Sequence, residues 1–566
     1  MDTQKFVLFL IFSTSMLFLW DAWQKEQHPV PTAPAVQGST GQRAINGQGE
    51  TPVPGEKLVS ALPGQSETTA DIAEPVNASG RLESGEKIVV RTDLVTAEID
   101  TAGGDIRRLE LLHHPDKEDK SKPFTLLQSQ YDHIYVAQSG LIGEGLPSHK
   151  TRYTAEARSY DLGAGQDKIE VRLAAPESEG VRVTKIYTFH RGSYLVDVSF
   201  EVANQGDAAI HPFSYFQILR DSQPPAGSIF MIPAYTGAAL YTEEEKFKKI
   251  EFSALDKGNA NYPKNADNGW IAMLQHYFLT AWLPQDKLPR EYYAKRLGEN
   301  EYAAGVIVPV GVIEPGSTDT ITVPLYAGPE EQTKLASIAP GLELTVDYGW
   351  LTVIGAPLFW LLSFFHSWTG NWGVAIILLT MSVKLAFFPL SAAGYRSMAK
   401  LRLVTPKLQR LREQHGNDRQ RMHQAMMDFY KTEKINPMGG CLPILVQIPV
   451  FISLYWVLLA SVELRYAPFA LWIEDLSSPD PYYVLPVIMG ISMFLQTKLN
   501  PPATDPIQAK VMQIMPFAFS IFFFFFPAGL VLYSLVNNVL SIAQQWQITR
   551  MIEASAAAAG KQKKLN

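Results

Sequence analysis

Five long runs almost without charged residues constrain this chain most. They occupy about residues 371–391, 440–461, 482–497, 511–526 and 528–548. Runs of about 16 to 22 mostly apolar residues suit the hydrocarbon core of a bilayer. We therefore expect a polytopic α-helical membrane protein and exclude a wholly soluble enzyme.

Charge divides the chain into two different parts. Residues 351–566 carry 18 Lys and Arg against 10 Asp and Glu, whereas residues 1–350 carry 31 against 46. The mean hydropathy of -0.02 therefore averages a polar, acidic part and an apolar, basic part. This division predicts a large water-exposed domain attached to the membrane region.

A sixth apolar run, Phe6–Trp20, follows Lys5 near the N-terminus. It has the length of a secretory signal or of a slightly short membrane anchor, and no convincing small-x-small cleavage site follows it. We expect residues 1–23 to be an uncleaved signal-anchor helix. With the five later runs it gives about six transmembrane helices, five of them forming the core 370–550, and cytoplasmic N- and C-termini.

Loop charges agree with that orientation. Segment 392–438 holds ten Lys and Arg against four acidic residues, whereas 462–481 holds one Arg against four acidic residues. Short cytoplasmic loops collect basic residues. The first segment is therefore expected in the cytoplasm, the second outside, and residues 24–369 in the periplasm.

The stretch Trp350–Trp368 is apolar enough to span, but it contains Gly355, Pro357 and His366. A span here would reverse the topology and leave only a few residues before the next run. We favour an amphipathic helix over 346–369 that lies in the outer interface, with tryptophans at headgroup level.

The water-exposed part begins with a linker. Residues 24–85 are rich in Pro, Gly, Gln, Ser, Thr and Glu, which predicts a disordered periplasmic tether. From 86 to 345 apolar residues alternate with polar ones, as in Val95–Asp100 and Val196–Val202, and glycine-containing turns separate the runs. This pattern predicts a large antiparallel β-sandwich.

No catalytic or metal motif stands out in the β-rich part. Its histidines, among them His133, His190 and His211, have no metal-ligand spacing, and no pair of acids is distinguishable from surface charge. We expect solvated or cross-strand histidines and no metal site. Binding, spacing or docking suits such a domain better than catalysis.

Lys384 lies about 13 residues into an apolar run, where burying its charge costs about 3 kcal/mol. Thr380 precedes it by one helical turn, and no acidic residue lies in the predicted spans. Two interpretations stand: a lysine that snorkels while amides form interhelical hydrogen bonds, and a hydrated, positively charged groove that attracts an acidic segment. The uncharged polar residues available in other spans are Gln447, Gln496, Gln513, Tyr533, Asn537 and Asn538.

Two further features bear on these interpretations. Runs 482–497 and 511–526 cover only about 24 Å against a core of about 30 Å, which predicts local bilayer thinning. Segment 392–438 reads as a helical hairpin with a break at 415–418 and bends or stops at Pro406 and at Asn436-Pro437. Its basic residues could serve ribosomal RNA, anionic lipid or topology alone.

Several motifs together closely resemble the Oxa/Alb superfamily of membrane protein insertases, in its bacterial YidC branch. They are NWGVAIILLTMSVKLAFFPL, MAKLRLVTPKLQRLREQHGND, INPMGGCLPILVQIPVF, SVELRYAPFALWIEDLSSPDPYYVLP and FPAGLVLYSLVNN. The resemblance is dense over about 340–550. The anchor, linker and β-rich region resemble the Gram-negative form, which implies a periplasmic β-supersandwich.

The resemblance implies a non-enzymatic insertase and chaperone of the bacterial inner membrane that needs no cofactor. Its implied partners are nascent and newly made membrane proteins, the lipid bilayer, the Sec translocon (SecYEG and SecDF), and the ribosome and signal recognition pathway, the last two through the basic hairpin and the tail 551–566. The family pattern gives the groove charge to Lys384, a substrate-contacting hydroxyl to Thr380, and a place near nascent chains to Tyr533.

Polarity adds Gln447, Gln496 and Asn537 to this predicted substrate groove. The family's usual residue at position 384 is arginine, and lysine keeps the charge but lacks the planar fork. Cys441 lies within a motif and is expected to be a small packing residue. Two other functional classes are possible for a membrane protein with a buried charge. A channel or transporter is disfavoured because the sequence shows no inverted repeats. An intramembrane protease is disfavoured because the sequence has no catalytic groups of that class after residue 371.

Overall fold

The computed structural model describes residues 82–565, with gaps at 118, 131–132, 224–234, 286, 299, 349–350, 416–418, 433–441 and 500–505. The predicted anchor 1–23 and nearly all of the predicted linker 24–85 lie outside the described residues. The chain divides into two compact units, one over Ala33–Val346 and one that includes Asp347–Asn566.

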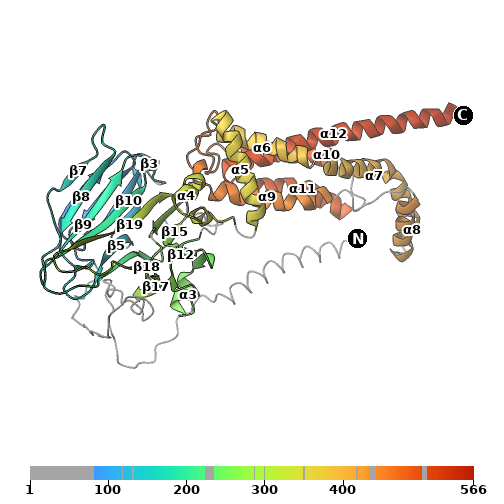
Figure 1. The fold of residues 1–566 in the computed structure, drawn as a ribbon. Coiled ribbons are helices and arrows are strands. Elements are labelled where there is room, and N and C mark those ends of the chain that lie inside the picture. The colour runs from blue at the N-terminus through green and yellow to red at the C-terminus, as the bar shows by residue number, and fades with distance from the viewer. Residues whose placement is uncertain are drawn as a thin grey trace, which may run out of the picture. The chain divides into compact units, whose positions relative to one another are not determined.

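The first unit is built on two β-sheets (Figure 1). The 10-stranded sheet has the order β14 (Asn265–Ala266), β17 (Arg290–Gly298), β18 (Glu301–Pro309), β11 (Phe213–Asp221), β5 (Ile134–Ile142), β4 (Pro123–Ser129), β3 (Asp105–Pro115), β2 (Val95–Asp100), β1 (Lys87–Arg91), β7 (Ser159–Asp161). The 9-stranded sheet has the order β13 (Lys246–Ile250), β12 (Gly237–Thr242), β15 (Trp270–Gln275), β16 (Phe278–Trp282), β19 (Thr318–Pro329), β10 (Leu195–Asn204), β9 (Val181–His190), β8 (Lys168–Ala174), β6 (Thr154–Ala155).

The alternation of apolar and polar residues explains how these sheets pack. Along β10 every second residue is buried, and Val198 and Phe200 join Val90 and Ile99 of the other sheet in one apolar core. Period-two burial is what a sheet with one face on a core requires. The described pairings are antiparallel except that of β1 with β7, which is parallel.

Little helix interrupts the sheets in the described part of this unit. The three short elements there are α3 (Phe252–Asp256), α4 (Gln332–Ile338) and η1 (Leu342–Thr345). Gly103 and Gly104 form the turn between β2 and β3 with φ of +87° and +58°, a conformation that suits glycine. This turn agrees with the expectation that glycine-containing turns separate the strands.

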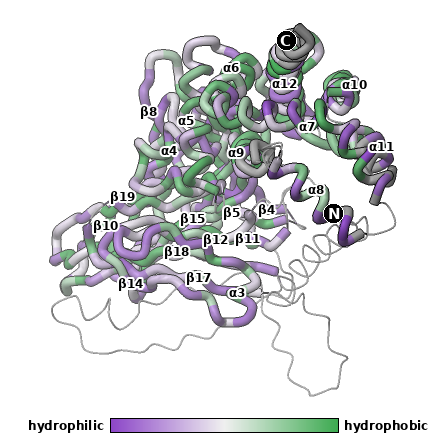
Figure 2. Tube along the Cα trace, turned by 90° about the vertical axis from the view of Figure 1, so that its right-hand side faces the viewer, coloured by the Kyte–Doolittle hydropathy of each residue, from purple (hydrophilic) through white to green (hydrophobic). Residues whose placement is uncertain are grey.

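The second unit is helical in its described part. Its elements are α5 (Thr352–Thr369), α6 (Trp372–Ala386), α7 (Phe388–His415), α8 (Arg419–Thr432), α9 (Leu442–Ala460), η4 (Val462–Leu464), α10 (Val484–Leu499), α11 (Pro506–Phe523) and α12 (Ala528–Leu565). Helix α12 packs against α6, α7 and α10, and α5 packs against α6 and α9. Figure 2 shows how hydrophobic residues dominate α6.

Within the described residues, no single helix has both the length and the apolar composition that a membrane crossing requires. Helix α6 and the first part of α7, Phe388–Leu408, meet that requirement as a pair bent by 67°. The predicted continuous run 371–391 is therefore broken at Phe387. Pro389 in the first turn of α7 has no backbone N–H to continue the α6 hydrogen-bond pattern.

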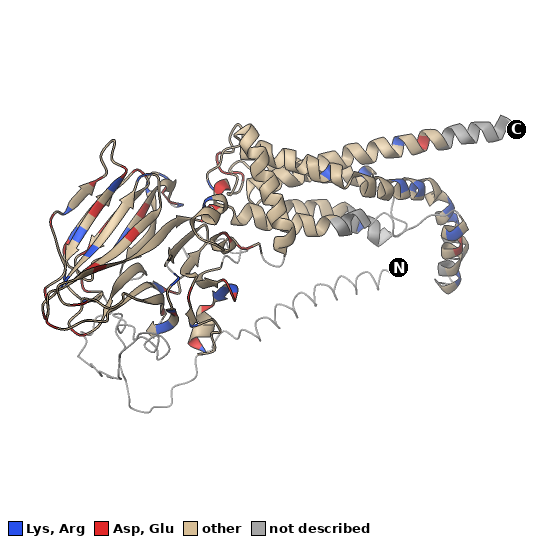
Figure 3. Ribbon diagram, viewed as in Figure 1, with Lys and Arg blue, Asp and Glu red and all other residues tan. Residues whose placement is uncertain are grey.

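Helices α7 and α8 correspond to the predicted hairpin, and Figure 3 shows their basic residues. The prediction that Pro406 bends or stops a helix is wrong as to a stop, because α7 continues from Phe388 through His415. The surrounding turns keep the helix although one hydrogen bond is lost. The predicted break at 415–418 begins at His415, which is the last residue of α7. Residues 416–418, Asn436-Pro437 and Cys441 lie outside the described residues.

Helix α5 covers most of the segment predicted to lie in the interface. One face buries Leu358 and Leu362, while Trp360 and Trp368 are 67% and 74% exposed. An apolar helix with exposed tryptophans has the composition of an interfacial or lipid-facing helix. The interfacial placement stays a prediction.

Candidate functional site

The six candidate residues lie on four helices of the second unit. Thr380 and Lys384 belong to α6, Gln447 to α9, Gln496 to α10, and Tyr533 and Asn537 to α12. Because α12 packs against both α6 and α10, residues far apart in sequence can meet along it.

Lys384 meets α12 through a residue that the sequence analysis missed. Its Nζ donates a hydrogen bond of 2.7 Å to Ser541 Oγ, and the Ser541 hydroxyl donates to the backbone oxygen of Asn537 at 2.7 Å. The four-residue spacing of Tyr533, Asn537 and Ser541 places them along one face of α12. That spacing was the signal that could have identified Ser541.

A second contact extends these polar groups to α9. Gln447 Nε2 donates to Asn537 Oδ1 at 2.6 Å. Gln447, Asn537, Ser541 and Lys384 thus form what we call the polar line, which runs from α9 across α12 to α6. Three of its four members were predicted as site residues from polarity or position alone.

The other three candidates are placed differently. Thr380 is buried, and its hydroxyl donates to the Ile376 backbone oxygen one turn earlier. Tyr533 is buried beside Phe451, with its ring centroid 6.0 Å from that of Phe451. Among the described residues, Gln496 makes no hydrogen bond to the polar line.

Among the described residues, no acid neutralises the charge on the polar line. A lysine ammonium has three N–H donors, and in the described part of the chain Lys384 uses one, on a neutral hydroxyl. No carboxylate there forms an ion pair with it. The site can therefore hold a partner that supplies negative charge or hydrogen-bond acceptors.

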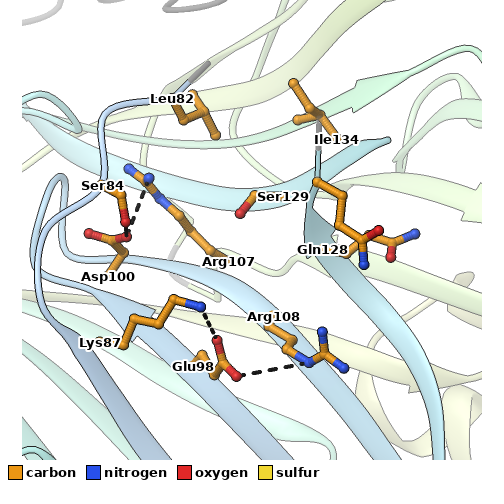
Figure 4. A pocket seen from close by; sticks show the side chains of 11 residues that line it. Leu82, Ser84, Lys87, Glu98, Asp100, Arg107, Arg108, Gln128, Ser129 and Ile134 are labelled. Carbon is orange, nitrogen blue, oxygen red and sulfur yellow. Dashed lines mark hydrogen bonds and ion pairs between the residues drawn. The ribbon is translucent and has the colours of Figure 1, made fainter. Parts of the chain in front are cut away.

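The β unit offers a different site, a polar hollow of about 510 Å³ on β1, β2, β3 and β4 (Figure 4). Its charges satisfy one another: Lys87 lies 2.9 Å from Glu98, and Arg107 lies 3.5 Å from Asp100. No acid–base pair is left poised for catalysis among these residues. The hollow has the character of a charged surface depression.

A buried cluster lies between the two sheets. Lys185 of β9 donates to the backbone oxygens of Gly103 and Ser139 at 3.1 and 3.0 Å, and to Asp105 Oδ1 at 3.4 Å. Desolvation raises the pKa of Asp105 to about 6, against the opposing effects of Lys185 and Arg107. Desolvation likewise lowers the pKa of Lys185 to about 8, against the opposing effect of Asp105.

Two histidines in this unit pair with acids. His133 Nδ1 lies 2.7 Å from Asp221, and His190 Nε2 lies 2.8 Å from Asp197. The described residues contain no group of three or more His, Cys, Asp or Glu arranged to hold a metal ion. These contacts are those of structural histidines.

Two protein families match the chain, one for each region. Residues 87–361 match the family described as YidC periplasmic domain, and residues 364–555 match the 60Kd inner membrane protein family. Together the two matches extend over most of the chain, and the boundary between them lies within α5.

Curated relatives match over nearly their whole length. The chain is 82% identical to the membrane protein insertase YidC of Nitrosospira multiformis, with 100% of both chains covered. It is 65% identical to that of Nitrosomonas eutropha, with 97% of this chain and 90% of the relative covered. A solved active YidC insertase is 18% identical, with a TM-score of 0.39 over 81% of this chain and 92% of that one.

Proposed function

This chain belongs to the YidC family of inner-membrane protein insertases, a non-enzymatic family with a large, mostly β-sheet periplasmic domain, and on that premise we propose how it works. The polar line is the part of a hydrated groove, open to the cytoplasm and to lipid, that receives polar segments of client membrane proteins. The chain inserts and folds these clients both alone and together with the Sec translocon.

The observation that carries this proposal is the contact of Lys384 with Ser541. Within the described residues, one neutral hydroxyl accepts from the Lys384 ammonium, which leaves two N–H donors for other acceptors. In a region of low dielectric, such a charge attracts carboxylates and carbonyl oxygens more strongly than it would in water. A client segment that carries these groups therefore gains a favourable contact inside the bilayer.

The lengths of two helices support a second part of the proposal, local thinning of the bilayer. Helix α10 has 16 residues and α11 has 18, so they extend about 24 and 27 Å at 1.5 Å per residue. The hydrocarbon core is about 30 Å thick. Local thinning around these helices would shorten the path of a polar client segment.

The remaining assignments follow the predicted topology. We propose about six transmembrane helices, cytoplasmic termini, and a periplasmic region over 24–369 that comprises the linker, the β-sandwich 86–345 and the interfacial helix 346–369. The core 370–550 carries the groove. Basic residues of the hairpin 392–438 and of the tail 551–566 are proposed to meet the ribosome and the signal recognition pathway.

The test is photocrosslinking to a stalled nascent membrane protein. A photoreactive amino acid is placed in turn at 380, 384, 533, 537 and 541, and at 538 as a control, because Asn538 turns away to bond Ser492 of α10. We expect strong crosslinks along the polar line and from 380 and 533, and a weak one from 538.

An insertion assay accompanies the crosslinks. Crosslinks together with poor insertion by Lys384→Ala support the charged groove. Crosslinks with unchanged insertion show that apolar contact and bilayer thinning suffice. The proposal that the Lys384 charge drives insertion is then refuted. Absence of crosslinks from the polar line overturns the groove assignment itself.

A further inference from the structure

The loop between α9 and α10, residues 461–483, is tightly organised by two aspartates. Asp475 Oδ1 accepts hydrogen bonds from the backbone N–H groups of Tyr466 and Ser477 at 3.0 and 2.8 Å. Asp480 accepts from the Trp472 indole N–H at 3.0 Å and from the Leu485 N–H at 2.7 Å. These carboxylates hold the loop in one shape.

The same loop binds the first residues of three helices. Its Asp480 receives the Leu485 N–H at the start of α10, and the backbone oxygens of Ser478 and Leu476 receive the N–H groups of Ala528 and Gly529 in α12, at 2.8 and 2.9 Å. Such groups have no acceptor within their own helix.

The third helix is α6. Asn371 caps it by accepting from the Val374 N–H at 3.0 Å and donates its amide to the Phe469 backbone oxygen at 2.9 Å. The Phe469 ring lies so close to Gly373 that a Cβ there would come within 2.0 Å of it. The loop is therefore fixed to α6, α10 and α12 at their N-terminal ends.

This rigid loop displays an apolar residue at a strained position. Leu471 has φ of +56° and is 89% exposed. A left-handed backbone is unfavourable for leucine, and so is an exposed leucine in water. The loop thus maintains two unfavourable features at one residue. Tyr482, eleven residues later, is 71% exposed.

We propose that the α9–α10 loop inserts its exposed side chains Leu471 and Tyr482 into the membrane–water interface and binds phospholipid at the boundary of headgroups and acyl chains. Leucine contributes the apolar contact there, and tyrosine keeps its hydroxyl among the headgroups. The loop acts as an anchor that fixes the depth of the three helices attached to it.

Continuity with the helix surface identifies lipid as the occupant. Tyr482 leads directly into α10, where Val487, Ile488 and Ile491 are 49%, 42% and 56% exposed. In an inner-membrane protein, an exposed aliphatic helix face meets acyl chains. The loop lies at the N-terminal end of that helix face. The ends of membrane helices lie at the membrane–water interface, where Tyr and Trp are enriched.

The test measures probe depth in liposomes without any client, so its outcome is independent of insertase activity. Cys441, the single cysteine of the chain, is replaced by alanine, and Leu471→Cys carries an environment-sensitive fluorophore. The vesicles are phosphatidylcholine–phosphatidylglycerol with a nitroxide placed either near the headgroup or deep in the acyl chain. Glu474→Cys, an exposed polar position of the same loop, is the matched control, and Tyr482→Cys is a second probe.

We expect the 471 and 482 probes to emit as in an apolar medium and to be quenched at least about twofold more by the shallow nitroxide than by the deep one, since interfacial insertion reaches only the headgroup boundary. The 474 probe should instead be quenched by aqueous iodide. If the 471 and 482 probes behave like the 474 probe, the anchor is refuted. If they are shielded from iodide and from both nitroxides, protein covers the loop and the proposal also fails.

Discussion

Each unit contains a lysine that is wholly or partly buried, and the two lysines differ in the partners that they have. Lys185 in the β unit is fully buried, with three acceptors and the rings of Tyr153, Tyr187 and Phe200 within 5.5 to 5.8 Å of Nζ. Lys384 in the helical unit is partly buried and has one neutral acceptor among the described residues.

Lys185 therefore stabilises the fold, whereas Lys384 is available to a binding partner. At Lys185 three acceptors match the three ammonium donors, so the lysine joins β9 to the opposite sheet and has nothing left to bind. At Lys384 two donors have no acceptor within the part of the chain that the structure describes. Changing each lysine should therefore affect different properties, stability in the first case and client insertion in the second.

The largest effect is expected from Lys185→Met. Removing the ammonium leaves Asp105 buried without its ion-pair partner, and breaking a buried pair in this way costs about 3–5 kcal/mol. The measurement is thermal unfolding of the full chain in detergent, followed by tryptophan fluorescence. The midpoint of the β-unit transition should fall by many degrees.

The double variant Lys185→Met with Asp105→Asn is the control, because it removes both charges together. It should recover most of the lost stability, since a neutral replacement of a whole buried pair is often tolerated. A single variant as stable as the native chain would mean that Lys185 does not hold the sheets together.

The same pair predicts the pH dependence of stability. The unfolded Asp105 loses its proton near 3.8 and the folded one near 6, so the folded state loses stability as the pH rises between these values. The unfolded Lys185 keeps its proton to 10.5 and the folded one only to about 8, so stability is regained as the pH rises from 8.

This pair therefore contributes least to stability between about pH 6 and 8. The double neutral variant should lack both slopes, each worth on the order of a few kcal/mol. Unfolding midpoints in urea, measured from pH 3.8 to 6 and from pH 8 to 10.5, where the two slopes are expected, measure the difference. Parallel profiles for the two proteins would contradict the assignment.

The sequence predicted what depends on local pattern. The alternation in Val95–Asp100 predicted a half-buried strand. Lys384 was identified as a candidate because its apolar run contains no other charge. Lys185 occupies an inward position of β9 and could have been noticed, but its partner Asp105 lies 80 residues earlier. Only the packing of two sheets brings them together, and no periodicity contains that information.

Local pattern also failed where several weak effects compete. Pro406 is a helix breaker by itself, yet α7 continues through it because the turns on either side keep their hydrogen bonds. The bend at Phe387 interrupts a run that hydropathy treats as continuous. Ser541 was not predicted because a serine in an apolar run is common and gives no sign of a site. Only the structure shows that its hydroxyl lies 2.7 Å from Lys384 Nζ.

The third prediction concerns Lys384→Ala, for which we expect insertion of clients with acidic segments to fall about tenfold, in line with the loss of one hydrogen bond to a charged group. Lys384→Arg should retain insertion because it keeps the charge. The rate of client protection from added protease, per amount of folded insertase, measures the effect.

Lys498→Ala is the matched control. Lys498 lies at the end of α10, over the ring of Phe494. Its replacement by alanine therefore removes a positive charge from the same unit and leaves the polar line unchanged. Equal losses from both variants would show that net charge matters and that the position of Lys384 does not.

The smallest effect separates the two faces of α12. Asn537→Ala removes the hydrogen bond to Gln447 within the polar line, whereas Asn538→Ala removes a bond of 2.8 Å to Ser492 of α10. Both should cost about 0.6 kcal/mol of stability, the usual value for a side-chain hydrogen bond between membrane helices. Only the first should also slow client insertion, by about twofold to threefold, because it disturbs groups next to Lys384. Equal insertion by the two variants at matched stability would reduce the polar line to interhelical packing, and the difference between the two lysines would then rest on charge alone.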